Sequence, residues 1–260
     1  MNQDAALWLS CVDLIMACRE GIVETARIKN DDARLPKLLA ACLLARSVST
    51  ARAVVHLIGL GHVVEARMLA RSIFENEFYL FRLARDDGSA FAREMFADEA
   101  YYHHALGQTM LKEEQAREAM GGEEQSCVQA IVKQVRQESP IAAPLKPQKV
   151  ISGTDISSAS VLYQKLSSDA AHPSLTALKR HFVQSAGTEG LLLKPRIKDG
   201  EVMDTAFLAS MALLGGCIAA NDAFGRTAGG ERLEGLVAEY HEIVARTLPA
   251  SAPSRGDATA

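Results

Sequence analysis

Apolar residues recur every three to four positions through almost the whole of this 260-residue chain. This spacing matches the turn of an α-helix, whereas the strict alternation typical of a half-buried β-strand is rare. We therefore predict an all-α protein, a single helical bundle of about eight helices within one domain at 1–248. The predicted helices cover 5–28, 35–60, 62–85, 89–120 (with Ser89 as N-cap), 123–138, 158–185 (with a break at Pro173), 204–224 and 231–248.

Three segments depart from the helical pattern. Three of the eight prolines fall within 139–157, which predicts a proline-rich loop there. The stretch 191–202 is the one place where the sequence allows a short β-hairpin. The tail at 249–260 is rich in small and polar residues, so we expect it to be disordered.

Charge and hydropathy exclude two broad classes of protein. The 28 basic and 32 acidic side chains give a formal net charge of −4, which excludes a generally polycationic nucleic-acid binder. The longest apolar run, at 206–220, is shorter than the roughly 18 residues that a membrane span needs. The N-terminus also lacks the basic start of a secretory signal. We therefore expect a cytoplasmic protein with no membrane partner.

The cysteines and the known cofactor motifs indicate no prosthetic group. The five cysteines are far apart and form no C-x-x-C pair, so we expect reduced, packed thiols and neither disulfides nor a zinc site. The sequence contains no phosphate-binding loop, no dinucleotide-binding glycine motif and no zinc-protease motif. We therefore predict no cofactor and no metal.

The helix predicted at 62–85 carries charges where an amphipathic helix would carry none. On a helical wheel Glu77 falls in the middle of the apolar face, so we expect it to be buried with a charged or hydrogen-bonding partner. Arg67, Arg71 and Glu75 form a second row at successive turns. This row is either a solvated ladder of ion pairs or the lining of a cleft. In a cleft, the two arginines would bind a ligand and Glu75 would be a candidate catalytic carboxylate.

A second unusual segment surrounds a histidine. Pro173 disfavours helical geometry at His172, so we expect the chain to kink there and Ser174 to cap the helix that resumes. Asp169 lies just before His172 on the same helical face, where it can orient the imidazole as a general acid or base. The alternative is a histidine that only satisfies the break in the helix.

Basic side chains are concentrated around this histidine. The stretch 165–198 contains six basic and two acidic residues, in a chain whose total charge is −4. Lys165, together with the hydroxyls of Tyr163 and Ser174, is a candidate to bind an anionic ligand such as a phosphate, a nucleotide or RNA. Alternatively, the basic residues form a solvated surface that balances the acidic residues at 98–124.

Short motifs in these two segments resemble a known family. The letters A-R-S-I-F-E at 70–75, followed by Y-x-x-L-S at 163–167 and H-P-S at 172–174, are similar to the motifs of a bacterial family of helical domains of unknown function. The resemblance covers about 35–224. It implies an α-helical bundle and points to Arg71, Glu75 and His172 as functional positions, but it implies no activity.

More distantly, the chain resembles the HEPN superfamily of helical bundles, which includes metal-independent ribonucleases of toxin and phage-defence systems. Their hallmark is an arginine, a polar residue and a histidine close together on one helix. Before His172 this chain has Lys165 or Ser167 in place of the arginine. The resemblance implies an enzyme that processes nucleic acid or nucleotides with His172 as acid and base.

Two functions therefore stand side by side. The first is a helical sensing or interaction protein, in which an arginine, a glutamate and His172 form a buried polar network that fixes the helix packing. The alternative is the HEPN-like enzyme, with Arg71 holding a phosphate of the substrate. The sequence does not identify the partner; the candidates are an anionic ligand and a second copy of the chain in a homo-oligomer. We also expect Arg71, Glu75 and His172 to come together across two packed helices.

Overall fold

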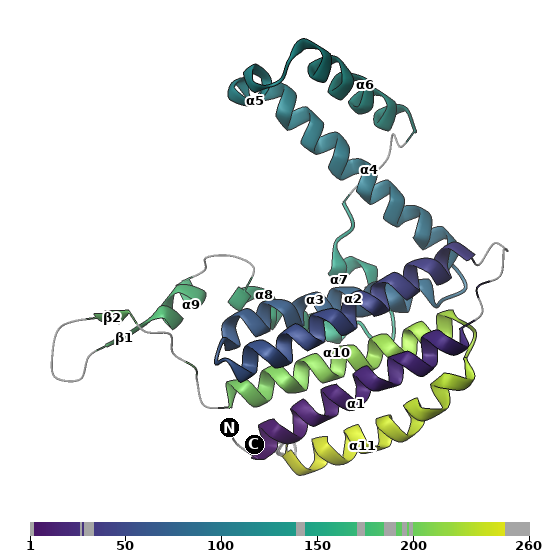
Figure 1. The fold of residues 1–260 in the computed structure, drawn as a ribbon, viewed down its shortest axis with the longest axis vertical. Helices are drawn as coiled ribbons and strands as arrows, with labels where there is room; N and C mark the ends of the chain where they lie inside the picture. Colours follow the sequence, from purple (N-terminus) through teal and green to yellow (C-terminus); the bar gives the residue numbers. More distant parts are fainter. Residues whose placement is uncertain are drawn as a thin grey trace, which may run out of the picture.

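The computed structural model describes residues 3–26, 28, 34–138, 144–170, 175–184, 191–193, 197 and 200–247. These residues are almost entirely helical, which confirms the all-α prediction (Figure 1). Eight described helices have 12 residues or more: α1 (Gln3–Thr25), α2 (Arg34–Gly59), α3 (Val63–Leu83), α4 (Gly88–Lys112), α6 (Gly122–Glu138), α8 (Ala159–Ala170), α10 (Glu201–Ala223) and α11 (Glu231–Thr247). Shorter described elements are α5 (Glu114–Ala119), α7 (Pro147–Val150), α9 (Leu175–Leu178) and 3₁₀ turns at Lys179–His181 and Ala228–Gly230.

Helix α3 lies at the centre of the bundle, where it packs against α2, α8 and α10 (Figure 1). Helix α10 is apolar on nearly all sides, so it is buried between α3, α2 and α1. Trp8 of α1 closes the other side of α10. Its buried ring lies 5.1 Å from Phe207 of α10 and 5.4 Å from Tyr240 of α11, between ring centres. Its indole Nε1 donates to Thr247 Oγ1 at 3.0 Å, so one side chain joins three helices.

Two helices, α2 and α10, are long and apolar enough to cross a membrane by length and composition alone. Within the structure, 61% of the apolar window of α10 and 33% of that of α2 are buried. The core helix of a soluble protein passes the same test, because it too is long and apolar; in that case other helices cover its apolar surface. The arrangement is therefore compatible with a soluble protein.

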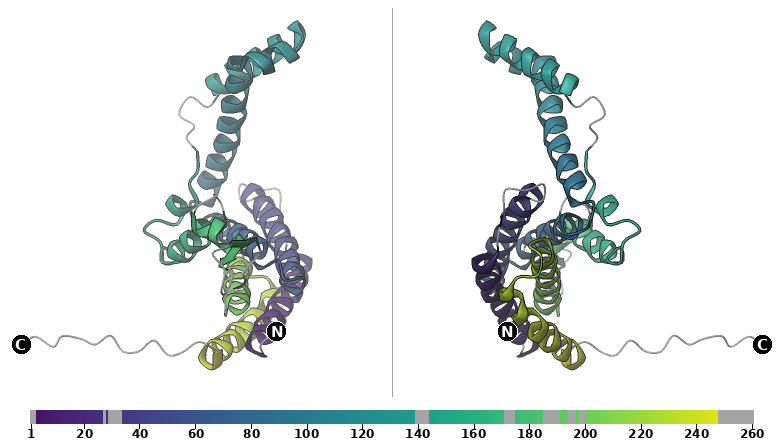
Figure 2. Two further views of the ribbon diagram at one scale, coloured as in Figure 1. Left: turned by 90° about the vertical axis from the view of Figure 1, so that its left-hand side faces the viewer. Right: turned by 90° about the vertical axis from the view of Figure 1, so that its right-hand side faces the viewer.

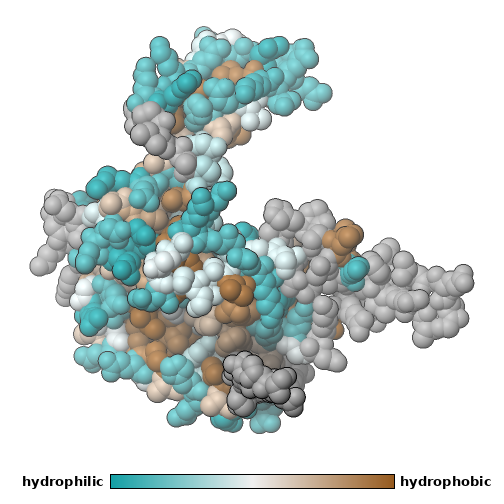
Figure 3. All heavy atoms as spheres, turned by 180° about the vertical axis from the view of Figure 1, so that it is seen from behind, coloured by the Kyte–Doolittle hydropathy of each residue, from teal (hydrophilic) through white to brown (hydrophobic). Residues whose placement is uncertain are grey.

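Helices α4, α5 and α6 project from the bundle as an arm (Figures 1 and 2). Helix α6 folds back along α4, and their contact is the main one within the arm. Seen from behind, the arm is largely hydrophilic with an apolar strip, and the bundle below it exposes a broader apolar patch (Figure 3). Large side chains of the arm that stay exposed are Phe96, Tyr102, Leu106 and Ile131.

The helix predicted at 89–120 differs from the observed one at both ends. The Asp87 carbonyl accepts a hydrogen bond from the Phe91 N–H at 3.0 Å, so Asp87 is the N-cap and Ser89 lies inside the first turn. The helix also ends early, because Glu113 adopts an extended backbone with ψ of 119°. The short α5 follows, and the two helices share the predicted range.

The β-hairpin is displaced from its predicted position. Strand β2 (Leu191–Leu193) lies in the predicted stretch 191–202, but it pairs with β1 (Phe182–Gln184), with Phe182 opposite Leu193. The helix expected to continue to 185 therefore ends sooner, at the 3₁₀ turn before β1. Phe182 and Val183 favour a strand over a helix, which explains the change.

The predicted loop at 139–157 contains a short helix, α7. Pro147 occupies its first turn, where the missing N–H costs nothing. The segment before α7 is tied to the arm, because the Leu145 N–H donates to Asp98 Oδ1 at 2.7 Å. The break predicted at Pro173 and the tail at 249–260 lie outside the described residues.

All five cysteines are free thiols, but they are not all packed. Cys11, Cys18 and Cys217 are buried. Burial raises the pKa of Cys11 to about 11 and that of Cys217 to about 12, so both stay protonated and unreactive. Cys42 and Cys127 are exposed, and for them the prediction of packed thiols is wrong. Their helices turn these positions away from the bundle.

Two glycines offer a matched test of the packing around α1. A Cβ at Gly229 would lie 1.9 Å from the backbone oxygen of Gly21, whereas a Cβ at Gly235 meets nothing within 4 Å. Gly229→Ala should therefore lower the free energy of unfolding by about 1–3 kcal/mol, because the backbone of α1 must move. Gly235→Ala, on the exposed side of α11, should raise it by about 0.5–1 kcal/mol. Urea unfolding measures both, and equal effects would contradict the close approach.

Candidate functional site

Four side chains from α3 and α8 form a single hydrogen-bonded network. Arg71 of α3 donates from Nε to Ser167 Oγ at 2.9 Å and from Nη2 to Tyr163 Oη at 2.7 Å, both on α8. The same Nη2 lies 2.8 Å from Glu75 Oε1, which also accepts the Tyr163 hydroxyl at 2.9 Å. We call these four residues the α3–α8 network.

The geometry of this network follows from helical spacing. Tyr163 and Ser167 are one turn apart on α8, so both hydroxyls face the same guanidinium fork. The Arg71 guanidinium also lies 5.0 Å from the centre of the Tyr163 ring, within the range of a cation–π contact. The Arg71 and Glu75 side chains are 27% and 26% exposed, so water reaches the outer edge of the network.

A second polar cluster joins α3, α8 and α10. Arg67 is 2% exposed, and its Nη1 donates to Asp204 Oδ2 at 2.8 Å and to Thr205 Oγ1 at 3.3 Å. Lys165 Nζ lies 3.1 Å and 3.2 Å from the two carboxylate oxygens of Asp204. Asp204 of α10 therefore bridges one cation from each of the other two helices. We call these four residues the Asp204 cluster.

These contacts set the ionisation of two groups. Burial by itself raises the pKa of Asp204, but hydrogen bonds and charge from Arg67 and Lys165 outweigh it and bring the pKa below its ordinary value. Burial raises the pKa of Tyr163; Arg71 opposes this effect and Glu75 adds to it. At neutral pH Asp204 is thus an anion and Tyr163 a neutral donor, the forms that their partners require.

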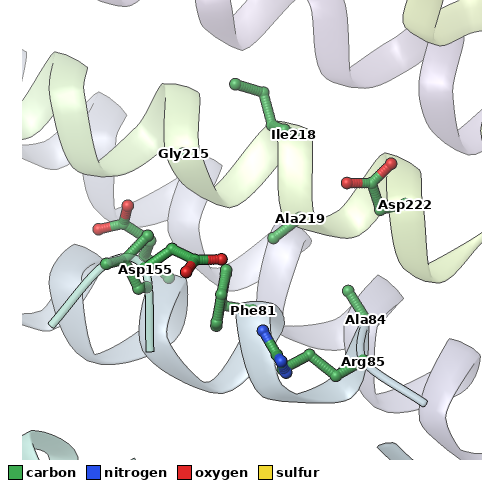
Figure 4. Close-up of a pocket in the computed structure, with 10 residues that line it drawn as sticks. Phe81, Ala84, Arg85, Asp155, Gly215, Ile218, Ala219 and Asp222 are labelled. Carbon is green, nitrogen blue, oxygen red and sulfur yellow. The ribbon is translucent and has the colours of Figure 1, made fainter. Parts of the chain in front are cut away.

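Glu77 lies apart from both groups, at a cavity between α3 and α10. The cavity has a volume of about 360 Å³ and is also lined by the turn that follows α7. In Figure 4, Phe81 of α3 and Arg85, just beyond the end of α3, lie on one side of the cavity, while Ala219 and Asp222 of α10 lie on the other. Glu77 is 8% exposed, and burial raises its pKa well above the ordinary value.

The partner expected for Glu77 is not among the described residues. Its Oε2 is buried and accepts no hydrogen bond from the part of the chain that the structure covers. The expectation of a charged or hydrogen-bonding partner is wrong there, because helix α10 presents Gly215 at this point and offers no side chain.

Several predicted site residues cannot be placed. His172 and Ser174 lie outside the described residues, and so does the side chain of Asp169, although its backbone belongs to α8. The predicted meeting of Arg71, Glu75 and His172 is therefore seen for the first two only. In the structure, the Tyr163 hydroxyl contacts both Arg71 and Glu75, and Lys165 is paired with Asp204.

Asp204 and Gly215 were missed in the sequence. An acidic residue in the first turn of a helix has a local explanation, since it interacts well with the helix dipole, and this hid the pairing of Asp204 with Arg67. Its position beside Thr205 on an otherwise apolar helix was the available signal. Within the described residues, no cluster of three or more His, Cys, Asp or Glu side chains could hold a metal ion.

Comparison with known families gives one result. The model of a family of unknown function, DUF5677, matches residues 37–189, which is more than half of the chain. The protein belongs to the DUF5677 family. No curated protein and no solved structure matches it significantly.

The region that matches DUF5677 contains the whole α3–α8 network but only part of the Asp204 cluster. All of the α3–α8 network lies inside 37–189, whereas Asp204, Thr205 and the α10 side of the cavity lie outside. The resemblance to a helical family of unknown function is confirmed, but the matched region ends at 189 and not near 224. The similarity to HEPN proteins stays a prediction.

Arg71 is the residue on which the α3–α8 network depends. Arg71→Ala removes two hydrogen bonds and an ion pair, so it should lower the free energy of unfolding by about 1–3 kcal/mol in urea. Arg71→Lys should restore only part of this, because an ammonium cannot present the fork that meets both hydroxyls. Arg52→Ala, at an exposed position on α2, is the matched control and should change stability by less than about 0.5 kcal/mol. If Arg71→Ala and Arg52→Ala lowered the free energy of unfolding equally, the network would not contribute to stability.

Asp204 should make stability depend on acid. Its native pKa lies below its ordinary value, so its contribution is complete above the unfolded pKa of about 3.9 and is lost as the pH falls through the native pKa. Asp204→Asn should therefore lower the free energy of unfolding by about 2–3 kcal/mol at neutral pH and by much less in strong acid. Denaturation of the parent and the variant at several pH values measures the difference, with exposed Asp13→Asn as the control. A difference that does not change with pH would contradict the charge pairing.

Proposed function

We propose that this chain is a cytoplasmic, non-catalytic sensing or interaction protein, in which the α3–α8 network fixes the position of α8 on the bundle. One observation carries the proposal. The Arg71 guanidinium bonds with Nε and Nη2 to Ser167, Tyr163 and Glu75 of its own chain.

The chemistry of catalysis asks for a different arrangement. An arginine that clamps a phosphate presents the arms of its fork to the substrate. A catalytic carboxylate needs an oxygen within reach of the reacting proton. Here Glu75 accepts from Arg71 and Tyr163, and Lys165 is bonded to Asp204. These contacts support a structural role for the residues that the sequence assigned to binding and catalysis.

The α3–α8 network holds α8, and the position of α8 affects the segment that follows it in the chain. Helix α8 leads into 171–174 and then into α9 and the hairpin β1–β2, so the α3–α8 network sits at the base of this part of the chain. The outer edge of the network is about a quarter exposed, where a ligand or partner can compete for its hydrogen bonds. A competitor would release α8 from α3. We propose that this release is the conformational change by which the protein responds to a ligand or partner.

The arm supports the interaction role. Phe96, Tyr102 and Leu106 of α4 are 50%, 62% and 59% exposed, although each is large and apolar. Clusters of exposed apolar side chains on a projecting element are typical of protein contact surfaces. We therefore place the contact with a protein partner, including a second copy of the chain, on this arm.

Hydrogen exchange tests the role of the network directly. Arg71→Ala should raise the exchange of α8 amides at 159–170 by about tenfold or more, because α8 loses its polar anchors on α3. Exchange in α11, which packs mainly against α1, should stay as in the parent. Unchanged protection of α8 would contradict the proposal.

Activity measurements separate this function from the HEPN-like alternative. The parent protein should leave total RNA and a panel of nucleotides intact, with and without a chelator. Consumption of either substrate by the parent, with loss of turnover in His172→Ala and unchanged exchange in α8, would establish the enzyme instead. Arg52→Ala serves as the control for handling and purity in both measurements.

A further inference from the structure

The cavity beside Glu77 has the size of a small-molecule site. Its volume of about 360 Å³ falls within the range of roughly 300–1,000 Å³ that ligand pockets occupy. Its walls are mainly apolar, with Phe81 from α3, Ile218 and Ala219 from α10, and Ile156 from the turn before α8. A few polar groups converge on these walls, as in most sites that orient a ligand.

One of these polar groups is deeply buried and has no partner. Glu77 is 8% exposed, and its Oε2 accepts no hydrogen bond among the described residues. A Cβ at position 215 would lie 2.1 Å from Glu77 Oε1, so the missing side chain of Gly215 is what leaves space for the carboxyl group. A buried oxygen without a donor is costly, and a ligand that supplies the donor would remove the cost.

The charges around the cavity select the kind of donor. Three carboxyl groups line it, from Glu77, Asp155 and Asp222, against the one guanidinium of Arg85. Arg85 lies over the Phe81 ring, 5.5 Å from its centre, and Asp222 is paired with exposed Arg226 at 3.1 Å. Even with Glu77 protonated, the carboxylates of Asp155 and Asp222 outnumber the one guanidinium within the lining, which favours a cation over a neutral or anionic ligand.

We propose that this cavity binds a small organic ammonium ion, with its charged group hydrogen-bonded to Glu77 and its apolar body against Phe81, Ile156 and Ile218. The ammonium offers three N–H donors, enough to reach Glu77 and the carboxylate of Asp155. The site uses none of the α3–α8 network, so this proposal does not depend on the proposed function.

Binding should be linked to a proton. Burial raises the pKa of Glu77 well above its ordinary value. The charged groups that line the cavity with it are Asp155 from the turn before α8, Asp222 of α10 and Arg85 from the turn after α3. The charge of Glu77 also acts on Tyr240 of α11. An ammonium ion favours the ionised carboxylate, so binding releases the Glu77 proton to water and the affinity should rise with pH.

Three probes with the same ring but different charge test the proposal on the full chain. Benzylammonium carries the cation, benzyl alcohol is neutral and benzoate is an anion. Isothermal titration should show benzylammonium binding at least about tenfold more tightly than benzyl alcohol, with an affinity that rises as the pH is raised, and no binding of benzoate. Equal affinities for the three probes, or no binding of benzylammonium at millimolar concentration, would overturn the proposal.

Variants assign the preference to Glu77. Glu77→Gln should abolish the preference for benzylammonium over benzyl alcohol, and Gly215→Ala should weaken both because it narrows the space beside the carboxyl group. Glu65→Gln, the same change in the first turn of α3, should bind as the parent does. If Glu77→Gln does not fold, Asp155→Asn at the exposed edge should still weaken benzylammonium selectively. A preference for the cation that survives in the folded variants would show that these carboxyl groups do not hold it.

Discussion

The burial of charge on α3 is the constraint on which the rest of the bundle depends. This helix is enclosed by α2, α8 and α10, and yet it carries Arg67 at 2% exposure. A guanidinium without water is tolerated only where oxygens meet it in good geometry. Asp204 and Thr205 of α10 supply them, and Tyr163 and Ser167 of α8 do the same for Arg71. Apolar faces alone would allow α8 and α10 to slide along α3, whereas these bonds fix their register.

The sequence predicts the fold where local rules decide it. The apolar period predicts most of the long helices to within a few residues, because their packed faces repeat with that period. The exceptions are the predicted helices at 89–120 and 158–185, which are longer than α4 and α8. The prediction fails where a distant contact or a competing preference decides. The start of α4 at Asp87 depends on a turn next to Arg82, whose Nη2 bonds to the Asp87 carboxylate at 2.5 Å. The pairing of β1 with β2 joins Phe182–Gln184, which lies in a predicted helix, to Leu191–Leu193, which lies in the predicted hairpin.

The candidate site is predictable to a different degree at each residue. Arg71 and Glu75 are recognisable because charges on a helix with few exposed sides need an explanation. Asp204 is hidden, since its place in the first turn of α10 already has a local explanation. Gly215 is hidden for a different reason. A glycine in an apolar helix gives no sign that its missing side chain makes room for a carboxyl group on the facing helix.

Glu75 and Glu77 of α3 differ in what explains their presence on the same helix. Glu75 accepts hydrogen bonds from Arg71 and Tyr163, so its presence is explained by the packing of α8 alone. Glu77 has no such bond in the described part of the chain, and burial opposes its ionisation. An apolar side chain of similar size would fill its place at lower cost in free energy, because it would leave no polar atom unsatisfied. A group that weakens the fold and borders a cavity is explained by what enters that cavity.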